Sequence, residues 1–289
     1  MTVNIQHVLT SFQGGLGLNL RIMREYYGVQ FFEITPKLGS LLGISAQDGV
    51  SSVPLRLICD NAITPYVLLA GCWQPEEFAF VQKVSGGIGD FVLVDVGANV
   101  GLFSRQCIAK LPNCKKVYCY EPDKSNFGLL TFNLSSFEAV VCKNVALSDT
   151  NGQATYFLDP DNCGNYSLNQ AAMPTEHKSG MLECVDALEE SKLWTTERRP
   201  LFYKSDTQGF DEKIATRMDM SFWDGVFGGI LEVWQIKKPS YDSERLRIIF
   251  DKFPNKCFLT DPNKMISTDE LMQFVGSEAG ASQDLGFWR

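Results

Sequence analysis

The sequence has few of the features that mark a metalloprotein, a redox protein or a membrane protein. It contains only two histidines, and its nine cysteines are scattered without a C-x-x-C pair, so no zinc or dithiol site is indicated. No run approaches the ~20 apolar residues of a membrane helix, and the start, MTVNIQHVLT, lacks the basic and apolar regions of a secretion signal. We therefore expect a cytoplasmic protein with reduced cysteines and no membrane partner.

Basic residues are also fewer than acidic residues. The 34 Asp and Glu residues against 26 Lys and Arg residues give a formal charge of -8. Such a chain would repel a polyphosphate backbone, so we expect no nucleic-acid partner. With 289 residues, 45% of them hydrophobic, the chain can nevertheless bury a full core.

The pattern that is present predicts an α/β protein. Short β-rich apolar runs alternate with helical stripes, which is typical of a doubly wound, mainly parallel sheet with helices on both faces. The expected strands are 91–96, 116–121, 139–146, 181–185, 201–206, 229–236, 256–260 and, closing the sheet at its edge, 284–288. The expected helices are 102–111, one that begins after the N-cap Asp123, 186–194, 243–253 and 267–275.

Two segments do not follow this alternation. We expect residues 1–80 to form an N-terminal cap or extension and residues 81–289 to form the ligand-binding domain. Residues 159–180 show no sustained periodicity, and a loop of about 20 residues inside a compact domain is usually functional or disordered. This loop is expected to face the substrate, with plain disorder as the alternative.

The stretch FVLVDVGANVGLFS, residues 91–104, carries the clearest site signal. In a doubly wound sheet the ligand lies beyond the carboxyl ends of the strands. Gly97 permits a tight turn, and Gly101 lets the next helix begin close to the strand and the ligand. A dinucleotide loop needs a further glycine where this sequence has Asn99, which argues against a pyrophosphate.

Two acids indicate the ligand instead. Asp95, at the end of its strand, would place a carboxylate beside the ligand, which favours a cation over an anion. Glu121 ends the next strand, where it can accept hydrogen bonds from both ribose hydroxyls. S-adenosylmethionine, an adenosine with a sulfonium and an amino-acid tail, has these features. The alternative is that both acids cap neighbouring helices.

Five blocks of the sequence carry a resemblance to a known family. GDFVLVDVGANVGLFS, VYCYEPDKSNFGLL, NVALSDTNG and LFYKSDTQGFDEKI resemble successive blocks of the FkbM family of S-adenosylmethionine-dependent methyltransferases, and the upstream GCWQPEEFAFVQKV resembles the family's entry segment. The similarity covers roughly residues 71–236. It implies a Rossmann-like class I methyltransferase fold, with a seven-stranded, mainly parallel sheet and an antiparallel last strand. It also implies O-methylation of a hydroxyl on a small natural product or sugar.

The cofactor-binding residues are assigned from the loop pattern and this resemblance together. They are Asp95, Gly97, Ala98, Asn99 and Gly101 in the first loop, Glu121 and Pro122 after the second strand, and Asn144, Ala146 and Ser148 in the segment expected beside the adenine. The sequence departs from the family's D-x-Q-G-(F/Y)-E block at two places. Ser205 precedes Asp206, and Asp211 stands where the family favours glutamate, which withdraws the acid by about one methylene.

The chemistry is expected at the end of the fourth strand. Methyl transfer requires an oxygen aligned with the S–CH3 bond and removal of its proton, and Asp206 is the candidate to contact the acceptor hydroxyl. Asp206 with Asp211 or Glu232 could instead hold a Mg²⁺ ion, and a role in helix capping is the structural alternative. His177, in the 159–180 loop, is a second catalytic candidate because its unperturbed pKa of ~6.5 suits proton abstraction.

The leading hypothesis is therefore a cytoplasmic O-methyltransferase that acts on a small-molecule acceptor. The alternatives are an NAD(P)-dependent Rossmann oxidoreductase and a non-catalytic nucleoside-binding protein. The sequence does not identify the acceptor, and it leaves nitrogen, sulfur and carbon open as acceptor atoms. A homo-oligomer is compatible with it, as is a monomer.

Overall fold

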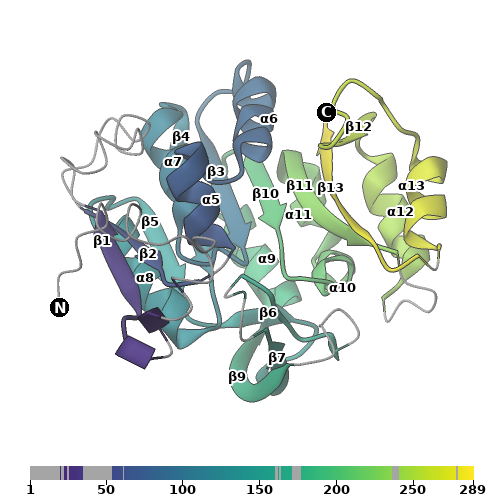
Figure 1. Ribbon diagram of the computed structural model, residues 1–289. Helices are drawn as coiled ribbons and strands as arrows, with labels where there is room; N and C mark the ends of the chain where they lie inside the picture. Colours follow the sequence, from purple (N-terminus) through teal and green to yellow (C-terminus); the bar gives the residue numbers. More distant parts are fainter. Residues whose placement is uncertain are drawn as a thin grey trace.

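A computed structural model of the chain describes residues 20, 23–24, 26–34, 54–60, 62–159, 162, 164–170, 177–235, 241–277 and 279–289. Its centre is a seven-stranded sheet in the order β12-β13-β11-β10-β3-β4-β5 (Figure 1). The strands are β3 (Phe91–Val96), β4 (Cys114–Tyr120), β5 (Val140–Lys143), β10 (Leu201–Ser205), β11 (Val226–Trp234), β12 (Asn255–Phe258) and β13 (Ser282–Trp288). The pairs from β5 to β11 are parallel, whereas β13 is antiparallel to both β11 and β12.

Helices cover both faces of this sheet. Successive residues of β3 alternate between the two faces, so Val92 and Val94 pack in one core and Phe91 and Leu93 in the other. The first core includes α9 (Ala187–Thr195), α10 (Asp211–Arg217), α11 (Met220–Gly225), α12 (Ser243–Asp251) and α13 (Thr268–Val275). The second includes α6 (Pro75–Ser85), α7 (Leu102–Lys110) and α8 (Lys124–Leu134). The expected class I methyltransferase fold, a doubly wound, seven-stranded, mainly parallel sheet with an antiparallel last strand, is confirmed.

The two helices beside the predicted ligand loop begin where the sequence indicates. Gly101 precedes α7, and its φ of 83° is a left-handed value that favours glycine. The Asp123 carboxylate accepts hydrogen bonds from the Ser125 and Asn126 backbone N–H groups, each at 2.9 Å, and so caps α8. The helix predicted after Asp123 is therefore confirmed together with its N-cap.

Two strand predictions were wrong in detail. The run 139–146 was expected to be one strand, but β5 ends at Lys143 and β6 (Ala146–Ser148) pairs with β9 in a different sheet. The chain turns at Asn144, whose side-chain amide donates to the backbone oxygens of Glu121 and Pro122. The strand predicted at the edge, 284–288, belongs to β13, which lies between β11 and β12.

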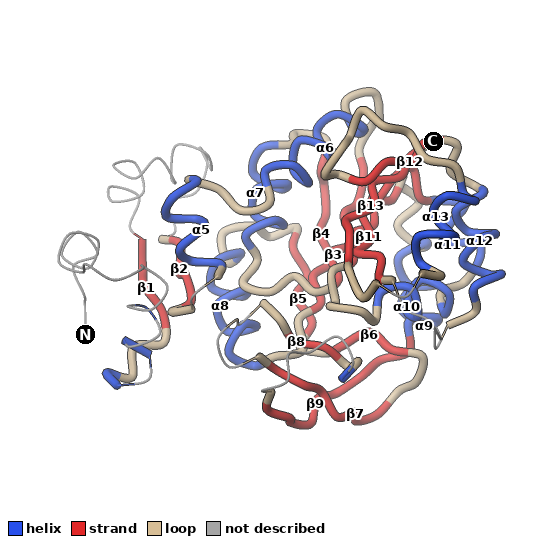
Figure 2. The backbone as a smooth tube through the Cα atoms, turned by 45° about the vertical axis from the view of Figure 1, so that its right-hand side comes forward, coloured by secondary structure: helices blue, strands red, loops and turns tan. Residues whose placement is uncertain are grey.

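A second sheet has the order β6-β9-β7-β8 and includes β7 (Gly152–Leu158), β8 (Tyr166–Ser167) and β9 (Lys178–Asp186). Both backbone views place β6, β7 and β9 below the seven-stranded sheet (Figures 1 and 2). The predicted strand 181–185 is thus part of the longer strand β9, and it belongs to this second sheet and not to the doubly wound sheet where it was expected. Parts of the predicted 159–180 loop, residues 160–161, 163 and 171–176, lie outside the described residues.

The described N-terminal elements are β1 (Phe31–Ile34), β2 (Leu55–Ile58) and α5 (Ile63–Ala70). Strands β1 and β2 form an antiparallel pair that packs, with α5, against residues of α7 and α8. Helix α6 spans the predicted boundary at residue 80 and contributes Phe80 to the core beneath β3, and the division into two domains stays a prediction. Within the described part of the chain, no helix is long and apolar enough to span a membrane.

Candidate active site

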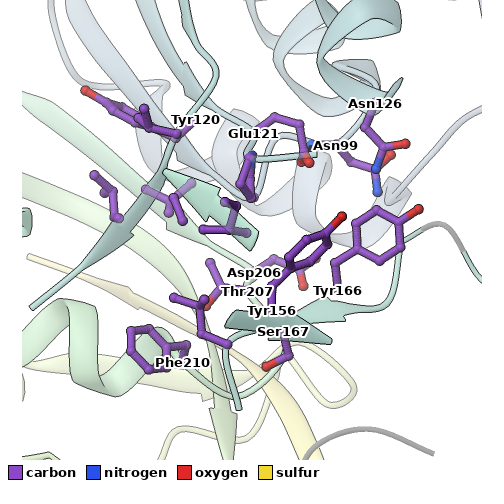
Figure 3. A pocket seen from close by; sticks show the side chains of 18 of the residues that line it. Asn99, Tyr120, Glu121, Asn126, Tyr156, Tyr166, Ser167, Asp206, Thr207 and Phe210 are labelled. Atoms are coloured by element: carbon purple, nitrogen blue, oxygen red, sulfur yellow. Dashed lines mark hydrogen bonds between the residues drawn. The ribbon is translucent and has the colours of Figure 1, made fainter. Parts of the chain in front are cut away.

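Two adjoining cavities lie at the carboxyl edge of the seven-stranded sheet, and Gly97, Asn99, Gly164 and Asp206 line both of them. The first cavity lies between the tip of β4 and the second, four-stranded sheet β6-β9-β7-β8, the small sheet of the molecule (Figure 3). The second cavity lies between the tips of β3 and β10 and the start of α6. The carboxyl edge is where a doubly wound sheet is expected to bind its ligand.

The loop after β3 makes close contact with the loop after β10. Gly97 has a φ of 75°, and a Cβ atom at this position would lie 2.0 Å from the backbone oxygen of Asp206. The Asp206 backbone N–H donates to the Val96 oxygen at 3.0 Å, which fixes the two loops together. Asn99 also has a left-handed φ, 51°, which asparagine tolerates better than most residues. The loop after β3 therefore needs a glycine at position 97, because a Cβ atom there would collide with the Asp206 backbone.

Glu121 lies at the wall of the first cavity, as the sequence predicts for the ribose acid. Its side chain is buried, and its two carboxylate oxygens accept hydrogen bonds from the Asn99 and Asp123 backbone N–H groups, each at 2.9 Å. Burial raises the pKa of Glu121 to about 8. The carboxyl group is thus fixed in position and keeps its proton to a higher pH than an exposed glutamate does.

The other walls of the first cavity are mostly apolar and aromatic. Val145, Ala146 and Leu147 line it from the segment after β5. Tyr156 of β7 and Tyr166 of β8, whose ring centroids are 6.2 Å apart, line it from the small sheet (Figure 3). Part of the predicted 159–180 loop therefore does reach the site. Tyr156 was missed, because no motif distinguishes it from other strand tyrosines.

Asp95 is buried below the second cavity, and its setting corrects the charge argument made from the sequence. Its Oδ2 atom accepts a hydrogen bond from Ser104 Oγ at 2.6 Å, and its Oδ1 atom lies 3.4 Å from the Lys204 ammonium. The carboxylate therefore already has a cation beside it, so it does not by itself require a cationic ligand. Lys204 was missed, although a lysine in the buried run LFYKS needs a partner and so gives a sequence signal.

Asp206 lines both cavities and is held by two amide side chains. Its Oδ1 atom accepts from Gln208 Nε2 at 2.7 Å, and its Oδ2 atom accepts from Gln74 Nε2 at 3.2 Å. Gln74 and Gln208 both have left-handed backbone values, φ 48° and 57°, which are uncommon for such residues and often occur at functional sites. Gln74 comes from the start of α6 and was not predicted.

The other six cofactor predictions divide into those that line a cavity and those that do not. Ala98 lines the second cavity, and Pro122 and Ala146 line the first. Asn144 and Ser148 line neither: Asn144 holds the tip of β4 through its amide, and Ser148 Oγ donates to Asp149. Among the loop residues, Gly101 also lines neither cavity and lets α7 begin close to Leu130 and Leu134.

The predicted base His177 is not brought to the site. It lies just before β9 and lines neither cavity. Its ring packs edge-on against Phe157, with centroids 5.4 Å apart, and Nε2 is 3.2 Å from Gln170 Nε2. The structure therefore gives His177 no contact with the cavities where a reaction could take place.

The acids proposed as alternative magnesium ligands have other partners or are not arranged for a metal. The buried Asp211 carboxylate accepts from the Ser205 hydroxyl and the Thr207 backbone N–H, which closes the turn before α10. Burial raises the pKa of Glu232 well above its ordinary value. No group of three or more His, Cys, Asp or Glu side chains in the described residues is arranged to hold a metal ion. The magnesium alternative therefore gains no support.

Comparison with known proteins adds distant similarities of fold. No protein-family model and no curated protein matches the chain. The FkbM methyltransferase of Methylobacillus flagellatus KT is 12% identical with a TM-score of 0.40, over 79% of this chain and 53% of that one. A SAM-dependent methyltransferase of Agrobacterium tumefaciens is 10% identical with a TM-score of 0.40, over 90% and 70%. EvdMO1 is 10% identical with a TM-score of 0.38, over 74% of this chain and 41% of its own length. The chain thus spans about half or less of two of these proteins.

Proposed function

We propose that this protein is an S-adenosylmethionine-dependent methyltransferase that methylates a hydroxyl oxygen of a small acceptor, such as a natural product or a sugar. The observation that carries the proposal is the position of Glu121. Its carboxyl group is fixed by two backbone N–H groups at the wall of an apolar cavity, at the ligand-binding edge of a class I methyltransferase fold. An acid at this edge of the sheet is where a Rossmann-like fold holds the ribose of an adenosine, and Asn99 in place of a loop glycine argues against a pyrophosphate.

The residues of the first cavity fit an adenosine. Each oxygen of Glu121 accepts one backbone hydrogen bond, and each can also bond a ribose hydroxyl, as an acceptor when it is bare and as a donor when it carries the proton. Val145 to Leu147 and Tyr156 offer apolar surface for a flat base. In the neighbouring cavity, the buried Asp95 Oδ1 atom has no hydrogen-bond partner among the described residues, so it could accept a hydrogen bond from a ligand group there.

When bound, the cofactor supplies an electrophilic methyl group on a sulfonium. The task of the chain is to align the acceptor oxygen with that group and to take up its proton. Asp206 is suited to both because Gln74 and Gln208 orient its carboxylate where the two cavities meet. With the cofactor bound, Asp206 would accept a hydrogen bond from the acceptor hydroxyl and take up its proton, while the methyl group passes from the sulfonium to the oxygen and leaves a neutral thioether.

Calorimetric titration tests this proposal. We expect S-adenosylhomocysteine to bind and NADH not to bind. Glu121→Gln should weaken S-adenosylhomocysteine binding by about 1–3 kcal/mol, because one oxygen that accepts from a backbone N–H group becomes an amide donor and the side chain can no longer keep its position at the ribose. Glu138→Gln, at an exposed position before β5, is the matched control and should leave binding unchanged.

Each other result would point to a different function. Tight NADH binding without S-adenosylhomocysteine binding would refute the proposal in favour of an oxidoreductase. Unchanged affinity in Glu121→Gln would remove the observation on which the proposal depends. Binding without methyl transfer to any hydroxyl compound in a broad acceptor screen would favour a nucleoside-binding protein without catalysis.

A further inference from the structure

The second cavity contains a lysine that the proposed transfer step does not use. The Lys204 side chain is 3% exposed, and it lines this cavity from the end of β10. Its Nζ atom lies 3.4 Å from Asp95 Oδ1 and 3.8 Å from Asp206 Oδ2. The ring of Phe103 lies beneath it, with the centroid 5.2 Å from Nζ. One buried ammonium thus stands between the acid of the first loop and the acid proposed to receive the proton.

The charges that line the two cavities can be counted. In the second cavity the charged lining residues are Asp95, Asp206 and Lys204, and in the first they are Asp206 and Glu121. Since burial raises the pKa of Glu121 to about 8, this group is mostly protonated at pH 7. Two carboxylates and one ammonium then leave a single net negative charge.

The acids that act on Lys204 from behind the cavity walls are not fully charged near neutral pH. Asp284 and Glu77 act on Lys204 from β13 and α6, but neither lines a cavity. Burial raises the pKa of Asp284 to about 8 and also raises the pKa of Glu77, and the two side chains share a hydrogen bond. Both are therefore less charged than exposed acids would be.

We infer that Lys204 is a specificity-determining residue: its ammonium limits the site to one net negative charge and thereby sets how strongly the site prefers a sulfonium to the neutral thioether product. This inference rests on the proposed function. One sulfonium brings the site to zero net charge, because the ammonium and carboxylate of the cofactor's amino-acid end cancel each other. After the transfer the thioether is neutral and Asp206 carries the proton, so the count is still zero.

Removal of the ammonium should therefore change the ratio of two affinities. Lys204→Met leaves two carboxylates without a cation, so the site should hold the sulfonium more strongly, relative to the thioether, by on the order of tenfold or more. Lys204→Arg keeps the charge and is the matched control, with the ratio expected to stay near that of the wild type. A merely structural role would weaken both ligands together and leave the ratio unchanged.

The experiment is calorimetric titration of S-adenosylmethionine and S-adenosylhomocysteine at pH 7 into the wild-type protein and the variants. Lys204→Gln serves as a second neutral variant if circular dichroism shows that Lys204→Met does not fold. An unchanged ratio in the neutral variant, or an equal change in Lys204→Arg, would overturn the role of Lys204. A wild-type protein that binds neither ligand would overturn the proposed function itself, and this inference with it.

One measurement requires no variant. Sinefungin carries an amine, protonated at neutral pH, in place of the methylated sulfonium, so the wild-type site should bind it more tightly than S-adenosylhomocysteine. Equal affinities of the wild-type protein for these two ligands would show that the site does not distinguish charge at that position, and would also overturn the inference.

Discussion

At the scale of single residues, Asp206 is where segments from different parts of the chain meet. Gln74 precedes it by more than a hundred residues, and Gln208 follows it after one intervening residue, yet each donates to one of its carboxylate oxygens. Two such contacts fix the direction of a side chain that would otherwise rotate freely. A carboxylate held in this way can act on a bound acceptor without first being ordered.

We predict that Asp206→Asn slows methyl transfer far more than it weakens cofactor binding. An asparagine keeps the shape but cannot take up the proton, so kcat should fall by about 10²–10⁴-fold, whereas S-adenosylhomocysteine affinity should change by about tenfold at most. Single-turnover methyl transfer and calorimetry measure the two effects separately. Asp224→Asn, at an exposed acid paired with Lys252, is the control and should change neither. A normal transfer rate in Asp206→Asn would exclude this residue as the proton acceptor.

At the scale of elements, the site depends on the contact between the loop after β3 and the loop after β10. We predict that Gly97→Ala destabilises the protein by about 2–4 kcal/mol, because the new Cβ would meet the Asp206 backbone oxygen and the φ of 75° strains any side chain. Gly128→Ala is the matched comparison. It lies inside α8 with nothing within 4 Å of the new Cβ, so it should stabilise by about 0.5–1 kcal/mol.

Urea unfolding of the two alanine variants gives both free energies. A Gly97→Ala variant as stable as the wild type would mean that the two loops can separate at little cost. The site would then be less rigid than the close contact of its backbone indicates.

The elements that the sequence predicts well are those fixed by local pattern. All six residues of β3 are buried and every one but Asp95 is apolar, so the run FVLVDV marks the strand 91–96 to the residue. The division of 139–146 could not be seen in the same way, because Asn144 turns the chain by binding the backbone oxygens of Glu121 and Pro122. Those partners are distant in the sequence, so the spacing of apolar residues does not indicate this contact.

The same distinction applies to the site. Asp95, Glu121 and Asp206 could be placed together in advance because parallel neighbouring strands bring their carboxyl ends to one edge. Gln74 could not, since it enters from a helix outside the βαβ pattern. His177 was chosen only because a loop histidine suits proton transfer, and sequence position does not tell which way a loop side chain faces. Lys204 was the avoidable omission, because a buried lysine must have an acidic partner.

At the scale of the whole molecule, buried acids should make stability depend on pH. Burial raises the pKa of Glu121, Glu212 and Asp284 to about 8 in the folded chain. Such groups bind protons more tightly when folded, so their contribution to stability is complete below the unfolded pKa of ~4 and is lost as the pH rises through about 8. Hydrogen bonds from Arg217 and Lys116 lower the pKa of Asp186 and Glu197, whose contributions are lost in acid.

We therefore predict that the free energy of unfolding is greatest near about pH 4–5 and falls as the pH rises from about 5 to about 8. Urea midpoints measured across this range test the prediction. Glu212→Gln cannot ionise, so its alkaline decline should be smaller, whereas the exposed Glu138→Gln should follow the wild type. A midpoint that rises from pH 5 to pH 8 would contradict the assignment of these buried acids.

The position of β13 has a consequence for how the molecule assembles. It is the only strand of the seven-stranded sheet that pairs with β12, and it also pairs with β11, so it joins two strands that precede it in the chain. During translation, β11 and β12 are synthesised before β13, the strand that lies between them. Until β13 emerges, the edges of β11 and β12 that will face it have unpaired backbone N–H and C=O groups. This side of the sheet can therefore form only after β13 has been synthesised.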